Sequence, residues 1–247
     1  MQHREEWKPS KFIRRNGKLM ASRDTREVAL SSRLAADLVA SCYDTYISDL
    51  ARGKLLDLGC GKVPLFDVYR DFVTDSICVD WGNSPHKCAH LDVECDLTQK
   101  LPFSNNEFDT IILSDVLEHI PDPGRLWREM SRVLAQEGRV LMNVPFFYWL
   151  HEQPHDYYRY TEFALRRFAE MAGMKVIHLA PIGGAPEVIA DIIAKNALRL
   201  RYVGRALAVA TQKCASVFVN TRIGRRISAS SGRQFPLGYF LVAQKCV

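Results

Sequence analysis

Acidic residues are missing from the C-terminal part of this sequence. No Asp or Glu follows Asp191, whereas ten Lys and Arg residues do. The first 191 residues hold the other 23 basic residues and all 28 acidic ones, so they carry a net charge of −5 in a chain of net charge +5. This asymmetry indicates either an anionic partner on one side of the molecule or a solvated basic helix face.

Long apolar runs and a secretion signal are missing too. No run approaches the ~20 residues of a membrane span, and the first residues, MQHREEWKPSKF, have no apolar core. We therefore expect a cytoplasmic protein. The composition, 47% hydrophobic and 25% charged, is that of one compact body. Within it, we expect residues 1–50 to form a mainly helical N-terminal cap and residues 51–247 to form the main domain.

Paired cysteines are also lacking. The seven cysteines are odd in number and irregularly spaced, which predicts reduced thiols rather than a disulfide framework. A short cluster of His86, Cys88 and His90, with Cys95 beyond it, lacks the paired spacing of structural zinc sites. We expect a loop at a strand edge there, and no metal ligands in the predicted site.

Short apolar runs alternate with helical periodicity along the chain. Such alternation predicts an α/β fold, with a mostly parallel sheet covered by helices on both faces. The predicted strands are 54–58, 76–80, 89–95, 108–113, 139–144, 175–179 and 238–244. The predicted helices are 31–50, 124–134, 162–172 and a long basic helical insertion at about 186–234, of which 186–219 reads as one helical region.

The first predicted strand runs into the turn Asp57-Leu-Gly-Cys-Gly61. Glycines there let the backbone turn sharply and approach a ligand closely. A dinucleotide site would need a third glycine where Pro64 stands, and the Asp57 carboxylate would repel phosphates. A carboxylate at this point suits a ligand that carries an amino group and no phosphate, such as S-adenosylmethionine.

Polar residues follow the next strands in the same way. Asp80 comes 21 residues after Gly59, a spacing that places a carboxylate against the two hydroxyls of a ribose. Trp81 can pack on an adenine face, and Asp96 can accept a hydrogen bond from the adenine amino group. Asp80 and Asp96 can alternatively be turn or N-cap residues. Ser114, Asp115, Glu118 and His119 follow the fourth strand, and their segment is expected to form the floor of the site near the methyl group.

These segments together resemble class I S-adenosylmethionine-dependent methyltransferases of the type 11 group. The resemblance covers about Lys54 to Pro145 and rests on LLDLGCG, CVD, CDL and LPFSNNEFDTIILSDVLEHIPDPGRLWREMSRVLAQEGRVLMNVP. It implies a Rossmann-like, seven-stranded sheet with an antiparallel last strand. By this resemblance, Asp57, Gly59 and Gly61 hold the methionine end of the cofactor, and Asp80 holds the ribose. Asp96 with Leu97 holds the adenine, and Ser114 and Asp115 line the floor. We also expect Leu58, Trp81 and His119 to lie at the cofactor, and His119 is a third candidate for the histidine that touches the acceptor.

One position departs from the family pattern. Members of the group commonly have a third glycine where Val63 stands. The substitution narrows the freedom of the loop, but the backbone contacts from Gly59 to Gly61 remain, so we still expect cofactor binding.

The segment after the fifth strand is dense in histidines, charges and aromatic rings. It reads PFFYWLHEQPHDYYRYT from Pro145, and a strand-end loop of this composition is a candidate acceptor site. A hydroxyl acceptor has to lose a proton, so we expect His151 or His155 to act as base, with Asp156 orienting a histidine and Arg159 holding an anionic group. Alternatively, these charged residues form a structural network that fixes the loop. The stretch HEQPHDYYRYT resembles a motif of bacterial methyltransferases in sugar, polysaccharide and lipid-linked glycan pathways.

The basic insertion combines apolar and positively charged side chains. It can lie on an anionic membrane at the inner face of the cell membrane, grip a lipid-linked diphosphate, form a homodimer face or pack back on the sheet. The sequence contains no recognised nucleic-acid-binding module, so we expect no nucleic-acid partner.

The sequence therefore predicts an enzyme that O-methylates a small or carrier-linked acceptor of the sugar or glycan type, using S-adenosylmethionine. A non-catalytic scaffold with the same fold is the alternative. A nicotinamide-dependent oxidoreductase is a third reading, against which Asp57 and Pro64 both count.

Overall fold

The protein is built around one seven-stranded sheet. The structure is a computed structural model that describes residues 1–84 and 89–246. The strands of this sheet are β3 (Lys54–Leu58), β4 (Asp75–Asp80), β5 (Val93–Glu94), β6 (Phe108–Ser114), β7 (Leu134–Pro145), β8 (Met174–Ile182) and β9 (Gly238–Lys245). Six of the seven lie close to their predicted ranges, whereas the strand expected at 89–95 is reduced to two residues.

The sheet is mostly parallel and has the predicted antiparallel last strand. Its order is β5-β4-β3-β6-β7-β9-β8, and β9 runs antiparallel to both β7 and β8. From β3 the chain first adds strands on one side and then returns to add β6 on the other. In such sheets ligands bind beyond the carboxyl ends of the strands where the order reverses, here between β3 and β6.

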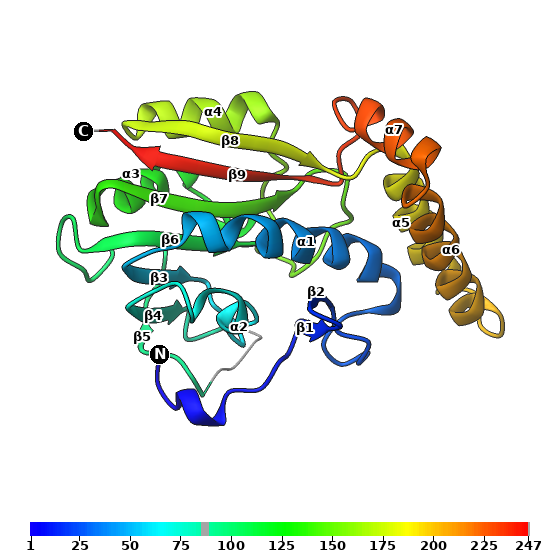
Figure 1. The fold of residues 1–247 in the computed structure, drawn as a ribbon, viewed down its shortest axis with the longest axis horizontal. Helices are drawn as coiled ribbons and strands as arrows, with labels where there is room; N and C mark the ends of the chain where they lie inside the picture. Colours follow the sequence, from blue (N-terminus) through cyan, green and yellow to red (C-terminus); the bar gives the residue numbers. More distant parts are fainter. Residues whose placement is uncertain (85–88, 247) are drawn as a thin grey trace.

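Helices cover both faces of the sheet, as the sequence predicted (Figure 1). One face packs against α3 (Pro123–Val133) and α4 (Glu162–Met171), from which Trp127 and Met130 are fully buried. The other packs against α1 (Arg33–Leu50) and α2 (Phe66–Tyr69), from which Tyr43 and Ile47 are buried. Apolar side chains of the strands alternate between these two cores, which fixes the sheet between its helical layers.

The prediction of a mainly helical N-terminal segment was wrong for the residues before α1. A two-stranded hairpin stands there, with β1 (Phe12–Arg15) paired to β2 (Lys18–Ala21). Short 3-10 turns flank it, η1 (Arg4–Glu6) and η2 (Leu30–Ser32). Asn16 and Gly17 both have positive φ, which is the turn chemistry of a tight hairpin. The division into a cap of 1–50 and a domain of 51–247 remains a prediction.

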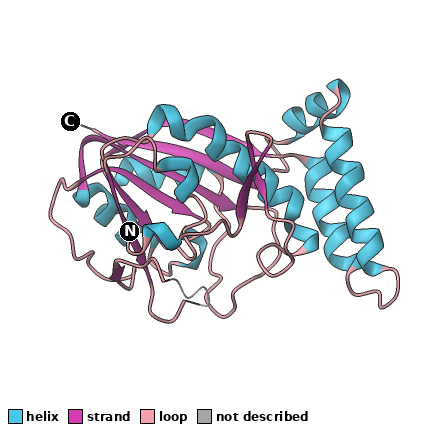
Figure 2. Cartoon of the chain, turned by 60° about the horizontal axis from the view of Figure 1, so that its bottom comes forward, coloured by secondary structure: helices cyan, strands magenta, loops and turns pink. Residues whose placement is uncertain are grey.

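The basic insertion between β8 and β9 is helical but contains breaks. It consists of α5 (Ala185–Ala197), α6 (Gly204–Val219) and α7 (Arg222–Ser231), so the region expected as one helix over 186–219 is two. The three helices project from one end of the sheet (Figures 1 and 2). They are tied to α1 because the side chain of Gln212 bonds the amide of Leu34 and the carbonyl of Ser31. None of the described helices is long and apolar enough to cross a membrane.

Candidate functional site

The glycine turn after β3 has the tight backbone that its sequence predicted. Gly59 and Gly61 have φ of 68° and 49°, and the amides of Gly59 and Cys60 both donate to the carbonyl of Val79. Val63, which replaces the family's third glycine, is itself left-handed with φ of 50°. A β-branched residue is strained there, and its carbonyl accepts a hydrogen bond from Trp7 Nε1 at 3.0 Å. The turn therefore keeps the glycine-like shape without the glycine.

Asp80 lies at the carboxyl end of β4, facing this turn. Its Oδ2 accepts the amide of Gly61 at 2.8 Å, and its Oδ1 accepts the amide of Trp81 at 2.7 Å. These amides fix the orientation of the carboxylate beside the turn, at the position where the sequence predicts the ribose. Asp57 is buried at the end of β3, and its Oδ2 lies 3.5 Å from the Tyr69 hydroxyl.

The residues expected to bind the adenine also make contacts within the protein. Asp96 caps a turn, with Oδ1 accepting the amide of Thr98 at 2.8 Å, which is the turn role that had been the alternative. Leu97 is 6% exposed and packs in the core, so little of its side chain is accessible to a ligand. Trp81 is 40% exposed and its ring meets that of His155 edge-on at 5.4 Å.

The floor residues after β6 belong to a polar network that the sequence did not reveal. Ser114 Oγ donates to Asn143 Oδ1, and Asn143 Nδ2 donates to Asp115 Oδ1. Lys11 Nζ completes it with a 2.7 Å ion pair to Asp115 Oδ2. Burial lowers the pKa of Lys11, but the Asp115 carboxylate more than offsets this, and the net pKa is raised.

This edge of the sheet has the chemistry that S-adenosylmethionine requires. The carboxylates of Asp57 and Asp80 suit an ammonium group and a ribose, and the strand-end turn between them carries no phosphate-binding pattern. When bound, the cofactor supplies an electrophilic methyl group on sulfur. The segment before β1 reaches over this edge through Trp7 and Lys11.

Asp156 and Arg159 fix the loop after β7. The guanidinium of Arg159 donates to both oxygens of Asp156, at 2.6 and 2.8 Å, and to the carbonyl of Trp149. These hydrogen bonds lower the pKa of Asp156 to about 2. Because the side chain of Asp156 is only 2% exposed and the Arg159 donors meet protein acceptors, the structure favours the structural-network alternative for both residues. Their contacts to each other and to Trp149 hold the loop in place.

The predicted histidines fall into two groups. His119 and His151 meet with ring centroids 4.9 Å apart, over the buried Glu118 of η3 (Leu117–His119). The ring of His155 instead contacts Trp81 and Tyr157, with its Nδ1 3.2 Å from the Tyr157 hydroxyl. Asp156 Oδ2 accepts the amide of His151 and lies 3.4 Å from its Nδ1, in agreement with an orienting role. Burial lowers the pKa of His151, but nearby Glu118 outweighs this and the net pKa is raised.

Glu118 lies in the predicted floor segment, but sequence reasoning gave it no role of its own. Its side chain is fully buried, and burial raises its pKa. Its backbone carbonyl accepts the amides of Tyr157 and Tyr158, so the loop after β7 folds directly over it. The only sequence signal was its position next to His119. Of the short metal-like cluster, His86 and Cys88 lie outside the described residues, while His90 Nδ1 lies 3.1 Å from the carbonyl of Gln2.

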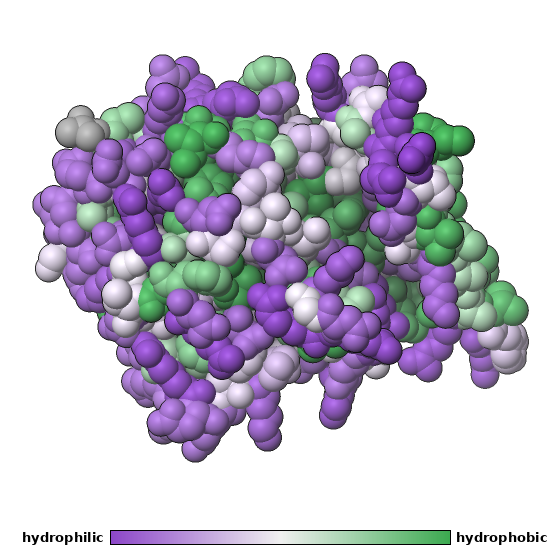
Figure 3. All heavy atoms as spheres, in the orientation of Figure 1, coloured by the Kyte–Doolittle hydropathy of each residue, from purple (hydrophilic) through white to green (hydrophobic). Residues whose placement is uncertain are grey.

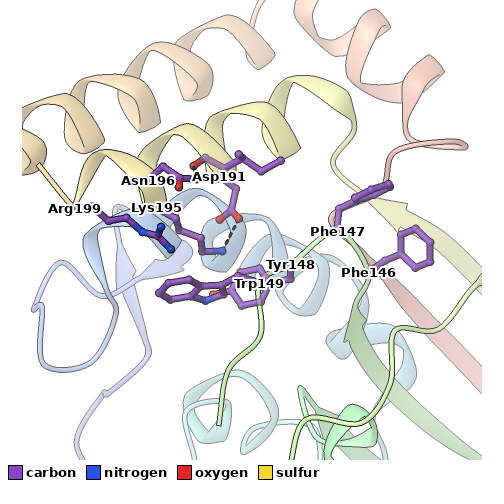
Figure 4. A pocket seen from close by; sticks show the side chains of 9 residues that line it. Phe146, Phe147, Tyr148, Trp149, Asp191, Lys195, Asn196 and Arg199 are labelled. Atoms are coloured by element: carbon purple, nitrogen blue, oxygen red, sulfur yellow. Dashed lines mark hydrogen bonds and ion pairs between the residues drawn. The ribbon is translucent and has the colours of Figure 1, made fainter. Parts of the chain in front are cut away.

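A pocket of about 340 Å³ lies between the loop after β7 and helix α5. Figure 4 shows Lys195 and Asp191 reaching down from α5 toward the rings of Tyr148 and Trp149. Lys195 Nζ pairs with Asp191 at 2.5 Å and lies 3.4 Å from the centroid of the Tyr148 ring. Burial lowers the pKa of Lys195 to about 8. The pocket is lined by Phe146, Phe147, Tyr148, Trp149, Asp191, Ile192, Lys195, Asn196 and Arg199.

Known proteins resemble this chain over somewhat more than half of its length. The ubiquinone biosynthesis O-methyltransferase of Acinetobacter baylyi is 23% identical over 151 residues, covering 57% of this chain and 58% of its own. The enzyme of the same name from Pseudomonas syringae pv. tomato is 27% identical over 149 residues, covering 55% and 57%. The chain thus spans somewhat over half the length of these relatives.

Solved structures share the fold over most of the chain. The methyltransferase in complex with the Trm112 methyltransferase activator of Haloferax volcanii has a TM-score of 0.58 at 18% identity, covering 91% of this chain and 95% of that one. The [4+2]-cyclase SpnF has a TM-score of 0.57 at 17% identity, covering 87% and 83%. A cyclase among these neighbours illustrates that the fold alone does not determine the reaction.

A family model described as "Methyltransferase domain" matches residues 56–142, from β3 to β7. The match contains the glycine turn, Asp80, the segment of Asp96 and the floor after β6. Together with the fold and the geometry of the turn, it identifies residues 56–142 as a methyltransferase domain that uses S-adenosylmethionine.

Proposed function

We propose that the whole chain transfers the methyl group of S-adenosylmethionine to an oxygen atom of a small or carrier-linked acceptor of the sugar or glycan type. The pocket beneath α5 is the observation that carries this proposal. It offers aromatic rings for the face of a sugar or another apolar ring, and Lys195 and Arg199 for an anionic group such as a phosphate.

Tyr148 links this pocket to the cofactor edge of the sheet. Its hydroxyl lies 2.8 Å from Ser32 Oγ, and its ring lies 5.3 Å from that of His151. One face of the residue lines the pocket, while its neighbour His151 lies beside Glu118 after β6. An acceptor in the pocket can therefore extend past Tyr148 toward the methyl group.

The chemistry requires positioning, exclusion of water and removal of one proton. The acceptor oxygen attacks the methyl carbon in line with the carbon–sulfur bond, whose electron pair passes to sulfur. The hydroxyl proton leaves as the new bond forms, and His151 and His155 are the candidate bases. The aromatic loop after β7 shields the reacting atoms from solvent.

Calorimetric titration with S-adenosylhomocysteine, the demethylated cofactor, tests the cofactor half of the proposal. We expect the wild type to bind it and not a nicotinamide dinucleotide. Asp80→Ala is expected to weaken binding about 10- to 100-fold, because hydrogen bonds from two hydroxyls to a carboxylate are lost. The matched control is Asp71→Ala, an exposed carboxylate just before the same strand, which is expected to leave binding unchanged.

Turnover separates an enzyme from a scaffold. Methyl transfer from labelled cofactor to glycan, lipid-linked and phenolic acceptors is expected, and the product linkage identifies the methylated atom. Cofactor binding without transfer to any acceptor class would favour the scaffold alternative. Absence of binding at millimolar ligand would contradict both.

We further propose that α5, α6 and α7 contact an anionic membrane surface where a lipid-linked acceptor resides. On α7 the exposed side chains of Ile223 and Ile227 stand beside Arg222, Arg225 and Arg226. Figure 3 shows hydrophobic and hydrophilic side chains next to each other over these protruding helices. Since no acidic residue follows Asp191, the surface complements negatively charged headgroups.

A further inference from the structure

Three side chains converge beside the cofactor edge without direct hydrogen bonds between them. Glu118 Oε1 lies 3.8 Å from His119 Nε2 and 3.7 Å from His151 Nε2, both too long for a hydrogen bond. One ligand atom of each residue lies within 4.8 Å of the other two. Glu118 and His119 come from η3 after β6, whereas His151 comes from the loop after β7.

The orientation of both histidines is fixed by the other ring nitrogen. His119 Nδ1 lies 2.8 Å from the carbonyl of His155, so it must be the donor there. His151 Nδ1 faces two acceptors, the carbonyl of Trp149 at 3.3 Å and Asp156 Oδ2 at 3.4 Å. In a neutral ring with a proton on Nδ1, Nε2 carries a lone pair. When both rings are neutral, both lone pairs face the carboxylate of Glu118.

This arrangement leaves the buried carboxylate of Glu118 without a hydrogen-bond donor. Within the described residues, neither oxygen of Glu118 has a hydrogen-bond donor, and His119 Nε2 has no partner either. A buried carboxylate without donors is strongly unfavourable. Two nitrogen lone pairs pointing at it add repulsion, which a cation between the three groups would convert into attraction.

We propose that Glu118, His119 and His151 bind a divalent transition-metal ion. Two imidazoles and one carboxylate are a common ligand set for Zn²⁺ and Fe²⁺, and they leave coordination positions open. In a tetrahedral site with metal–ligand distances of about 2.1 Å, ligand atoms lie about 3.4 Å apart, slightly closer than here. The Nδ1 contacts are the second layer of hydrogen bonds that holds metal-binding histidines in place. Glu152 Oε2 lies 3.8 Å from His119 Nε2, on the more exposed side of the cluster.

The ion would also explain how the acceptor hydroxyl loses its proton, an inference that rests on the proposed O-methylation. A metal-bound hydroxyl has a lowered pKa, so the acceptor loses its proton before it attacks. The proton passes to His155 or to water, the oxygen forms a bond to the methyl carbon, and the carbon–sulfur electron pair stays on sulfur. His151 is then a ligand, which leaves His155 as the histidine of the loop available as base.

Cobalt and zinc binding to chelator-treated full-length protein tests the site. We expect one Co²⁺ per chain with the visible absorption of a low-symmetry nitrogen and oxygen site, displaced by Zn²⁺. Zinc at about a hundredfold excess over its Kd is expected to raise the melting temperature by about 5–10 °C. Glu118→Gln and His119→Asn with His151→Asn are expected to lose this spectrum and this shift. His155→Asn, in the same loop, is the matched control and keeps both.

Glu118→Gln also reports on the buried charge without metal. It removes the uncompensated carboxylate, so in chelator we expect it to melt above the wild type, and with zinc to melt below it. Equal cobalt spectra and equal zinc shifts in the wild type and Glu118→Gln would overturn the proposal, because the metal would then be bound elsewhere, for example by the exposed Cys214 or Cys246.

The two proposals fail separately. Metal binding at this site without methyl transfer to any acceptor would leave the metal site standing and contradict the proposed activity. Methyl transfer that persists in chelator, with no specific cobalt spectrum, would leave the activity standing and overturn the metal site.

Discussion

At the scale of single residues, the ion pair of Asp156 and Arg159 holds the loop after β7 in place. Both Asp156 oxygens accept from Arg159, and one also accepts the amide of His151. Removal of the negative charge leaves a partly buried guanidinium without its partner, which is strongly unfavourable. The loop that carries both candidate bases therefore depends on this pair.

We expect Asp156→Asn to lower the free energy of unfolding by about 3 kcal/mol at neutral pH. The wild-type carboxyl has a pKa of about 2 when folded and about 3.8 when unfolded. A lowered pKa stabilises the fold above the unfolded value, and this stabilisation is lost as the pH falls toward 2. The difference between variant and wild type should therefore shrink between about pH 4 and pH 2, as measured by denaturant unfolding at pH 7 and pH 3.

Asp24 provides the control for this pH dependence. Its pKa is also lowered to about 2, by hydrogen bonds from Arg26, but the pair is at the surface. Exposed pairs contribute little, so Asp24→Asn is expected to have a much smaller effect at pH 7. Equal losses for the two variants, or a loss for Asp156→Asn that does not change with pH, would contradict the assigned role.

The turn between β3 and α2 is an element whose shape the cofactor requires. A Cβ placed on Gly59 would lie 2.5 Å from Val116 Cγ2, and its φ is positive. Gly173 after α4 has nearly the same φ, 71°, but open space around it. A comparison of alanine substitutions at these two glycines therefore separates the effect of backbone strain from that of steric overlap.

We expect Gly173→Ala to cost about 1–2 kcal/mol in unfolding free energy, the price of a left-handed alanine. Gly59→Ala should cost at least 1 kcal/mol more and abolish binding of S-adenosylhomocysteine, as measured by unfolding and calorimetry. Adding Val116→Ala should recover the steric part only. If Gly59→Ala resembled Gly173→Ala in both assays, close approach at the turn would not be needed.

Most elements with a local sequence signal were predicted well, whereas contacts between distant parts of the sequence were not. The strand Lys54–Leu58 matches because an apolar run and a glycine turn mark it in the sequence. The hairpin of β1 and β2 was missed although Asn16-Gly17 is a local hairpin signal. The pairing of Lys11 with Asp115 joins residues 104 positions apart, and Glu118 is buried only because the loop after β7 folds over it. Neither contact leaves a periodic trace in the sequence.

At the scale of the molecule, the three helices of the insertion form a basic projection attached to a more acidic body. Gly204 lets α6 pack closely on α5, since a Cβ there would lie 2.3 Å from the carbonyl oxygen of Ala197. The core between them is small, consisting of Ala194, Ala197 and Ala208. Many larger apolar side chains of these helices consequently remain exposed, among them Val217, Ile223 and Ile227.

We expect the protein to sediment with vesicles that contain anionic lipid and not with neutral vesicles, and high salt should release it because exposed charges are screened. Replacement of Arg222, Arg225 and Arg226 on α7 by Glu should weaken binding at least tenfold, since each cation near the surface contributes about 1 kcal/mol. Replacement of the exposed Arg166 and Arg167 on α4 by Glu is the control on another element, with a smaller loss expected. Equal binding of the two sets of variants would mean that net charge alone, and not the α7 surface, attracts the protein to the vesicles. A concentration-dependent dimer without vesicle binding would mean that the exposed apolar side chains contact a second copy of the chain.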